Sequence, residues 1–257
     1  LSGICLDDSE RRLQTGLQRL ETELARQILP DGGHVTRSPE ALLCAYRLVV
    51  MVLEALSAVG QEPPHVVRNA HDRMAPMLRF FRHGDGALAL FNGGGECDPR
   101  LVAGLLARDE IRGQPFFHAR HSGYQRLSAS RTLCLIDCGK PPAGAFSEQA
   151  HAGTGAMELS SGADRIVVNC GTGGLSNPSW NVPLRATAAH STMIVADTSS
   201  AAVLPVGPVL ERLGSGRLGG PREAFSRRVE TPQGWSVEAM HDAYADTFGV
   251  RHERHVT

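Results

Sequence analysis

The apolar residues in the first part of the chain recur with the period of an α-helix. Over residues 7–29 they fall three or four positions apart, so they share one face of a helix. A second helix is expected over residues 38–60, because its opening Ser-Pro pair supplies a cap and a preorganised first position. A third is expected over residues 65–81, and a short one near residues 101–107. The first half is therefore predicted to be an array of helices.

After Pro115 the pattern changes to the period of two that is typical of β-strands. Five stretches show it: 122–139 and 155–171, each as a pair of strands, and then 185–197, 234–245 and 248–256. Strands that follow helices without alternating with them indicate separate domains. We predict a multidomain protein, α then β, with a helical domain over residues 1–117 and an antiparallel β-sandwich over residues 118–257.

The two ends predict a fragment. The chain opens at a helix start without Met and stops within the strand-like run "RHERHVT". We therefore expect both domains to be incomplete. A leader could precede the chain, so a cytoplasmic and a periplasmic location both stay open.

Composition excludes some classes of protein. The chain has 257 residues, is 42% hydrophobic and carries a net charge of -1, whereas a nucleic-acid-binding domain usually shows a basic stripe. No apolar run approaches the roughly 18 residues of a membrane span, so no span is expected. The glycine-rich stretch "NCGTGG" follows a strand but does not lead into a helix, which argues against a phosphate-binding loop.

Two histidines and an asparagine are expected to meet in the sandwich. His151 precedes one strand of the 155–171 hairpin and Asn169 ends the other, so both lie towards the same end. A further strand could bring His190 beside them. Two histidines and an oxygen ligand suggest a metal site, although asparagine is a poor zinc ligand. A hydrogen-bonded polar cluster is the alternative.

A second group of polar residues is expected where the two domains meet. His34 and Arg37 precede the second helix, where they either belong to an ordinary loop or hold an anionic ligand at the helix N-terminus. Tyr124 opens the first strand, either as a packing aromatic or as a phenolic acid or base. Position alone leaves these alternatives open.

Several ordered motifs resemble the heparinase II/III-like family. They are "LPDGGHVTRSPEALL", "RMAPMLRFFRHGDGALALFNGGG", "SGYQRL", "AHAGTGAMELSSGADRIVVNCG" and "RATAAHSTMIV", which together span most of the chain. The resemblance implies a partial α/α toroid followed by an antiparallel β-sandwich. It also implies a carbon–oxygen lyase that cleaves polysaccharides containing uronic acid by β-elimination. A base removes the proton at C5, an acid protonates the leaving oxygen, and a further group neutralises the uronate carboxylate.

The family motifs occur here in altered form. The Tyr-His pair that follows Ser-Pro in the family's lyases is replaced within the stretch Glu40 to Leu42. In a motif resembling H-x-H-x-D, Gln149 replaces the first histidine and His151 matches the second. Asn169 stands in the position of an aspartate, and His190 matches a later histidine. The metal-type histidines are thus retained, whereas the acidic ligand is not.

The resemblance suggests a role for each candidate. Tyr124, His34 and Arg37 are the predicted catalytic residues, with Tyr124 as acid or base and Arg37 paired with the uronate carboxylate. Arg37, Asn92 and Gln149 are the predicted substrate-binding residues. His151, Asn169 and His190 are predicted to form a structural site, with or without zinc. An acidic polysaccharide or oligosaccharide is the expected partner, and the oligomeric state stays open.

Two alternatives to the lyase remain. The first is a catalytically degenerate glycan-binding or cell-envelope module that keeps the fold without the acid and base. The second is hydrolysis by two facing carboxylates, for which Glu40 and Glu96 are the available pair.

Overall fold

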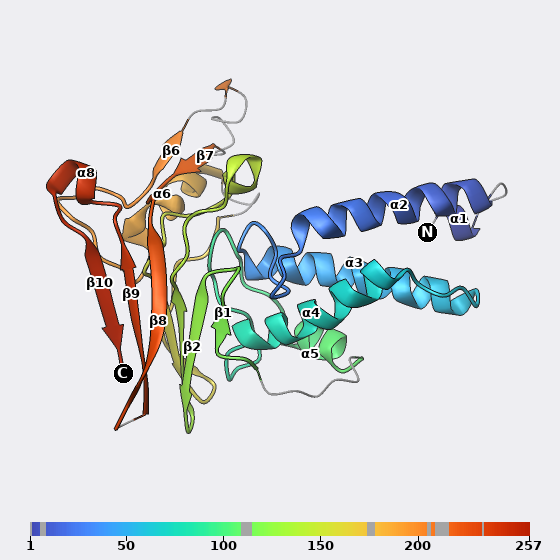
Figure 1. The fold of residues 1–257 in the computed structure, drawn as a ribbon, viewed down its shortest axis with the longest axis horizontal. Coiled ribbons are helices and arrows are strands. Elements are labelled where there is room, and N and C mark those ends of the chain that lie inside the picture. Colours follow the sequence, from blue (N-terminus) through green and yellow to red (C-terminus); the bar gives the residue numbers. More distant parts are fainter. Residues whose placement is uncertain are drawn as a thin grey trace.

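The helical half lies beside the strand-rich half in the computed structural model (Figure 1). The structure describes residues 2–5, 9–108, 115–173, 178–204, 207–208, 216–232 and 234–257. Its helices are α1 (Ser2–Cys5), α2 (Ser9–Gln27), α3 (Pro39–Ala58), α4 (His65–Phe81) and α5 (Pro99–Leu106). All four predicted helices are confirmed, except that the expected start at Asp7 and Asp8 lies outside the described residues.

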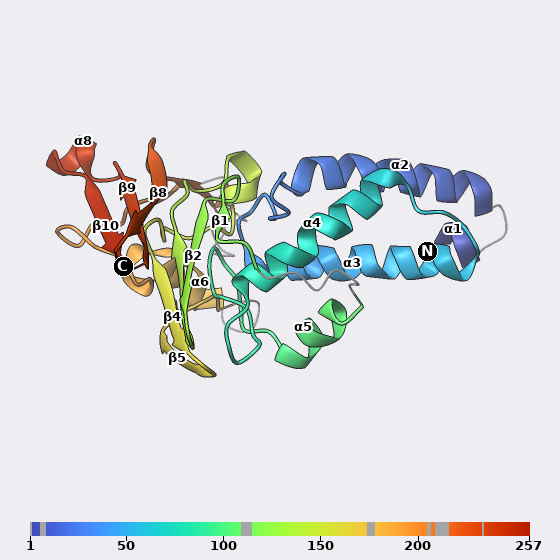
Figure 2. The ribbon, with the colours of Figure 1, turned by 60° about the horizontal axis from the view of Figure 1, so that its bottom comes forward.

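The start of α3 follows directly from the sequence. Ser38 is the cap, its side chain accepts a hydrogen bond from the Ala41 backbone N–H at 3.4 Å, and Pro39 is the first helical residue. Helices α2, α3 and α4 lie side by side and run in alternating directions (Figure 2). Short connections between them produce this arrangement.

Helix α3 is more apolar than its neighbours. By length and composition it could cross a membrane, with a mean hydropathy of 1.8, although 33% of that window is buried in the protein. A core helix of a soluble protein meets the same test. By length and composition, one described segment thus reaches the size of a membrane span, which was not expected from the sequence.

Two antiparallel sheets form the sandwich. The first, in the order β1-β2-β3-β4-β5, consists of β1 (His118–Ala119), β2 (Tyr124–Ala129), β3 (Thr132–Asp137), β4 (Met157–Ser161) and β5 (Asp164–Val167). The second, in the order β10-β9-β8, consists of β8 (Ala224–Thr231), β9 (Gly234–His241) and β10 (His252–Val256). A separate pair joins β6 (Ala202–Leu204) to β7 (Arg217–Gly219). The predicted class, helices followed by antiparallel sheets, is confirmed.

The first sheet is the middle layer of the molecule. On β3, Leu133 and Leu135 belong to the same apolar core as the helices, whereas Cys134 and Ile136 pack with Val237 of the second sheet. Alternation along a strand explains this, because successive side chains point to opposite faces. The helical core therefore continues across the predicted boundary at residue 117.

One predicted strand is wrong. Residues 185–197 form the end of α6 (Asn181–Arg185), a 3₁₀ turn (Thr187–Ala189) and an irregular stretch with a single bridge between Val195 and Thr198. The buried Arg185 side chain donates to the backbone carbonyls of Ala150, Ser147 and Gly216. These anchors, which periodicity cannot reveal, hold the segment outside a sheet. The first residues of "NCGTGG" leave β5 without regular structure, and Gly174 lies outside the described part.

Candidate functional site

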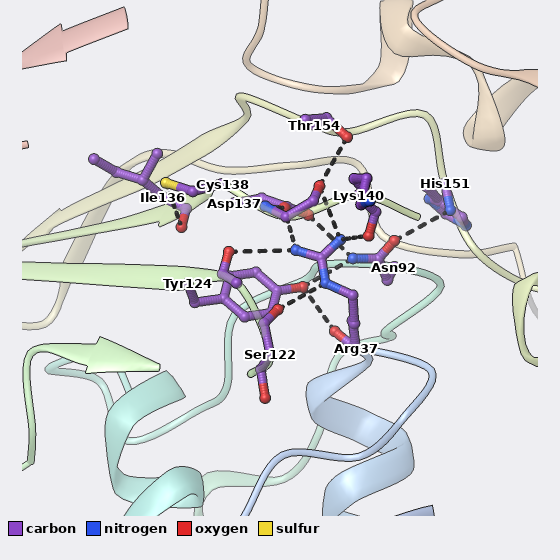
Figure 3. A network of polar contacts seen from close by, with 12 residues as sticks. Arg37, Asn92, Ser122, Tyr124, Ile136, Asp137, Cys138, Lys140, His151 and Thr154 are labelled. Carbon is purple, nitrogen blue, oxygen red and sulfur yellow. Dashed lines mark hydrogen bonds and ion pairs between the residues drawn. The ribbon is translucent and has the colours of Figure 1, made fainter. Parts of the chain in front are cut away.

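Arg37 joins the helical half to the first sheet (Figure 3). It lies directly before the Ser38 cap, in the left-handed backbone region with φ 61°. Its guanidinium forms an ion pair with Asp137, whose side chain lies on the helix-facing side of β3. The other acceptors are four backbone carbonyls, those of Ser122, Gly123, Gly139 and Lys140. The guanidinium packs so closely on Gly139 that a Cβ there would lie 2.5 Å from Nη2.

Tyr124 and Asn92 complete this network. The Tyr124 hydroxyl donates to the Arg37 carbonyl at 2.7 Å and accepts from Asn92 Nδ2 at 2.8 Å. Asn92 Nδ2 also donates to Asp137 Oδ2 at 3.1 Å, and Asn92 Oδ1 accepts from the His151 N–H at 3.4 Å. Residues from the helical half, the first sheet and the following loop thus satisfy one another in a buried cluster.

The roles predicted for Arg37 and Tyr124 do not fit this geometry. Every nitrogen of the Arg37 guanidinium already donates within the protein, so none is left for a uronate carboxylate. Burial acts to lower the pKa of Arg37, but the Asp137 carboxylate outweighs it and the net shift is upward. Tyr124 is 0% exposed, and burial raises the pKa of its hydroxyl above the usual range. In this structure both are structural residues rather than acid, base or ligand.

The side chains of His34 and Asn92 are likewise buried and hydrogen-bonded within the protein. His34 Nδ1 accepts from the Thr36 backbone N–H at 3.3 Å, which leaves the proton on Nε2 to be donated to Gln27 Oε1 at 3.2 Å. Burial lowers the pKa of His34. Gln149, in contrast, has an exposed side chain. Of the predicted catalytic and substrate-binding residues, only Gln149 is exposed to solvent.

The predicted His151–Asn169–His190 cluster does form. The two histidine rings lie 5.1 Å apart between centroids, and Asn169 Oδ1 lies 3.3 Å from His190 Nδ1. Burial lowers the pKa of His151 to about 3 and that of His190 to about 4, so both are neutral at neutral pH. The His151 Nδ1 atom is buried without a hydrogen-bond partner.

The donors of this cluster do not fit the zinc site that the resemblance implies. His151 Nδ1 could accept a metal, but the third donor would be the neutral amide of Asn169. That amide is committed, because Oδ1 also accepts from the Ser191 N–H at 3.2 Å and Nδ2 donates to Glu158 Oε1 at 3.0 Å. Among the described residues, no three His, Cys, Asp or Glu side chains are grouped to hold a metal ion.

Sequence reasoning missed Glu158 and its pairing with His83, and these two residues organise this region. Glu158 is fully buried and accepts from the backbone N–H groups of Leu90 and Asn169. His83 Nε2 lies 3.0 Å from Glu158 Oε2, and His83 Nδ1 lies 2.8 Å from Ser160 Oγ. The available signal was the alternation on β4, where polar Glu158 and Ser160 share the face opposite to Met157 and Leu159.

A basic pocket lies beside the buried network. It has a volume of about 670 Å³ and is bordered by the turn before α3, β1 and its following loop, the end of β3 and the start of β8. Its charged side chains and imidazoles are those of Arg37, His118, Arg120, His121 and Lys140, and the thiol of Cys138 also lines it. No Asp or Glu appears among the residues that line it in the described part of the chain. We call this cavity the junction pocket.

Asp31 lies near the junction pocket, but it is not among the described residues that line it. Its carboxylate accepts from the backbone N–H groups of His121 and Ser122 at 2.8 and 2.7 Å, and from Ser122 Oγ at 2.8 Å. Arg120, His121 and Lys140 are exposed. The pocket therefore presents accessible cations, whereas the Asp31 carboxylate accepts hydrogen bonds from the loop that carries two of them.

Comparison with known proteins agrees with this fold. Residues 111–257 match the family model described as heparinase II/III-like, C-terminal. The chain belongs to the heparinase II/III-like family. This result confirms the resemblance seen in the sequence motifs.

Relatives of this heparinase II/III-like chain are longer than the chain itself. FtsZ-localized protein C from Caulobacter vibrioides is 32% identical over 245 residues, which are 95% of this chain and 42% of that protein. The heparan sulfate lyase HepC from Pedobacter heparinus superposes with a TM-score of 0.68 at 17% identity, over 99% of this chain and 41% of HepC. A heparinase III structure gives 0.68 at 14% identity, over 97% and 42%. The chain thus spans about two fifths of each relative, and the structural matches show the fold alone.

Proposed function

We propose that this chain binds an acidic polysaccharide at the junction pocket, and that it supplies binding rather than the acid and base of a lyase. The proposal adopts the alternative of a degenerate glycan-binding module. It also keeps the expected partner, an acidic glycan. Because the chain spans about two fifths of its relatives, we extend the proposal to any longer protein that contains it: that protein binds an acidic polysaccharide through this pocket.

One contrast carries the proposal. The residues predicted for catalysis are buried and hydrogen-bonded within the protein, whereas the cations beside them are exposed around a cavity. Lysine and arginine recognise carboxylates and sulfates through charge-assisted hydrogen bonds. A cavity of about 670 Å³ can accept a sugar-sized group.

The family supports a glycan as the ligand. Two of the matched structures are named as a heparan sulfate lyase and a heparinase, and heparan sulfate is an acidic polysaccharide. The name FtsZ-localized protein C gives a location for the curated relative but no glycan chemistry. Glycan recognition by this chain therefore rests on its family and on the charge of the pocket.

β-Elimination is the second candidate, and family membership is the observation that favours it. It requires a base that reaches C5 and an acid that reaches the leaving oxygen. Tyr124 and His34 are too buried and too well hydrogen-bonded to serve. Glu40 is committed as well, since its Oε2 accepts from the Gly95 N–H at 2.7 Å.

One experiment separates the two candidates. The full-length protein is titrated with heparan sulfate, with dextran as a neutral control, while binding and ultraviolet absorbance are followed together. We expect binding to heparan sulfate that weakens with salt, and no increase in absorbance from unsaturated uronate. Arg120→Ala and Lys140→Ala should weaken binding. No binding to heparan sulfate would refute the proposal, and an absorbing product would establish the lyase in its place.

A further inference from the structure

An arginine on the second sheet lies between two exposed aromatic rings. The Arg228 Cζ atom is 5.4 Å from the centroid of the Phe117 ring and 5.5 Å from that of Trp235. Phe117 is 51% exposed and Trp235 is 52% exposed. Such contacts are favourable cation–π geometry, and they leave about half of the surface of each aromatic residue accessible to solvent. We call Phe117, Arg228 and Trp235 the aromatic clamp.

The clamp is held in place by hydrogen bonds on one side of the arginine. Arg228 Nη1 donates to the Arg126 carbonyl at 2.9 Å, to the Phe117 carbonyl at 3.2 Å and to Gln125 Oε1 at 3.4 Å. Partial burial lowers the pKa of Arg228. A guanidinium fixed in this way orients the two rings before any ligand arrives, which reduces the entropy cost of binding.

The clamp is continuous with the junction pocket. Phe117 directly precedes His118, which lines the pocket, and Arg228 follows the lining residue Ser226 by two positions on β8. Gln125 links them, because its Nε2 donates to Ser226 Oγ at 2.9 Å while its Oε1 accepts from Arg228. Two residues along a strand span roughly 7 Å, so a ligand longer than one sugar can reach from the pocket to the clamp.

We propose that the aromatic clamp is a second subsite that stacks a sugar ring of the acidic glycan whose charged group occupies the junction pocket. The proposal rests on the proposed function and adds that the recognised unit is an oligosaccharide rather than a single charged sugar. The apolar C–H face of a pyranose covers an aromatic ring. The arginine beside that ring pairs with a carboxylate or sulfate on the same or the next sugar.

Charge complementarity favours this ligand over an uncharged apolar partner. Arg228 lies between the rings. Arg120 and Arg228 both lie near enough to His118 to lower its pKa, so positive charge gathers here. Glu230 is the opposing charge, since it pairs with Trp235 in the β8–β9 register and is exposed. Replacing that carboxylate by an amide should therefore strengthen the binding of an acidic oligosaccharide.

Tryptophan fluorescence gives a direct test, because the chain has only two tryptophans, Trp180 and Trp235. Trp180 is 55% exposed on a turn outside the clamp, so Trp180→Phe leaves Trp235 as the single reporter and serves as a matched control. The Trp180→Phe variant of this 257-residue chain is titrated with a heparan sulfate disaccharide and with a longer heparan sulfate oligosaccharide. We expect Trp180→Phe to bind both as the native protein does, and only the longer chain to shift the Trp235 emission.

Affinities of further variants complete the test. Trp235→Ala and Phe117→Ala should each weaken the longer oligosaccharide roughly three- to tenfold, as expected for the loss of an aromatic contact, and leave the disaccharide unchanged. Glu230→Gln should tighten the longer oligosaccharide. Circular dichroism establishes that each variant is folded.

The outcomes distinguish the two proposals. If neither probe binds, the proposed function fails and the clamp fails with it. Suppose that both oligosaccharides bind and that Lys140→Ala weakens the binding of both. If Trp235 emission then stays the same, and Trp235→Ala binds both oligosaccharides as tightly as the native protein, the junction pocket is supported and the clamp is refuted. Concentration-dependent self-association that Trp235→Ala abolishes, without any effect of glycan, would also refute the clamp and assign these rings to a contact between copies.

Discussion

The junction between the helices and the first sheet contains arginines in two opposite situations. Arg37 is buried and donates to a carboxylate and four carbonyls, whereas Arg120 is exposed at the rim of the junction pocket. The residue type is the same, but the number of free donors differs. Sequence motifs drew attention to the first arginine, while the structure makes the second available to a ligand.

This contrast shows how burial changes the meaning of a polar motif. A buried charge must be paired within the protein, since leaving it unpaired is costly. Its presence in a motif then reports how two parts of the fold are joined. An exposed charge beside a cavity has no such requirement, and its pairing can be left to a ligand.

The largest predicted effect breaks the buried side of this comparison. Arg37→Ala leaves Asp137 buried without its partner, so we expect a loss of about 3–5 kcal/mol in the free energy of unfolding. Arg37→Lys should be intermediate, since one ammonium cannot reach all five acceptors. Urea denaturation measures both, and the matched control Arg120→Ala should change stability by less than about 0.5 kcal/mol.

A different result would restore the catalytic interpretation of Arg37. If Arg37→Ala unfolds at the same urea concentration as the native protein and loses only glycan binding, the guanidinium contacts the ligand. The arrangement with Asp137 would then be a resting state rather than a structural tie.

The second prediction concerns Asn169, which must both donate and accept. Asn169→Asp replaces the donor facing Glu158 by a second carboxylate, so we expect a loss of about 1–3 kcal/mol in the absence of metal. Thermal denaturation measures this loss. Zinc should leave the melting temperature of the native protein unchanged and should raise that of the variant, because an anionic third ligand is then present beside His151 and His190.

Asn69 on α4, which is half-buried and whose Nδ2 lies 3.2 Å from His65 Nδ1 at the helix surface, offers a matched control for this substitution. Asn69→Asp changes the same atoms outside any buried cluster and should be nearly neutral. A stabilising effect of zinc on the native protein, confirmed by elemental analysis, would contradict the assignment of Asn169 as a hydrogen-bonding residue and would support the structural zinc site.

Sequence periodicity predicted most of the fold because its elements are locally determined. The Ser38-Pro39 start of α3 and the turn between β4 and β5 are both written in a few neighbouring residues. The stretch 185–197 was misassigned because its alternation looks like a strand, while the Arg185 anchors that decide its conformation lie far away in the sequence.

For the candidate site, the sequence could predict which residues lie close together but not which hydrogen bonds they form. The motifs correctly indicated that His151, Asn169 and His190 lie together, but not that Asn169 serves Glu158 as well. Arg37 and Tyr124 were also correctly placed at the junction. Their partners could not be predicted, since a hydrogen bond over 87 residues depends on how the helices dock on the sheet.

The third prediction uses the buried histidines of the second sheet. The Ala243 N–H donates to His241 Nδ1, so His241 carries its proton on Nε2 and donates it to His252 Nδ1 at 2.9 Å. Adding a proton to either ring breaks this series of hydrogen bonds. Burial lowers the pKa of His241 to about 4; Arg254 lowers this pKa as well, whereas Asp242 raises it. The unfolded value is near 6.5, so the unfolded state binds more protons between these values.

The contribution of this pair to the free energy of unfolding is therefore fully present above about pH 6.5, and it decreases as the pH drops towards about 4. The loss is at most roughly 1.4 kcal/mol per pH unit for each proton. Urea midpoints at several pH values measure it. His252→Asn should make the profile less steep, since His151 and His190 still contribute, whereas His255→Asn, at an exposed position on the same strand, should leave it unchanged. Equal profiles for both variants would show that the pair does not control acid stability.

The smallest predicted effect sharpens the exposed side of the comparison. Burial lowers the pKa of His118, and the neighbouring Arg120 and Arg228 lower it further while Asp31 opposes them. His118 is thus neutral at neutral pH, and a bound anion favours its protonated form.

Binding of heparan sulfate should tighten as the pH falls towards the His118 pKa, by no more than about fivefold, since a partly exposed charge pair contributes about 1 kcal/mol or less. His118→Gln should remove this dependence without changing the urea midpoint measured above about pH 6.5, where the stability from the buried pair is complete. A pH dependence that survives His118→Gln would move the titrating group elsewhere, and a shifted urea midpoint would place His118 with the buried residues instead of the pocket.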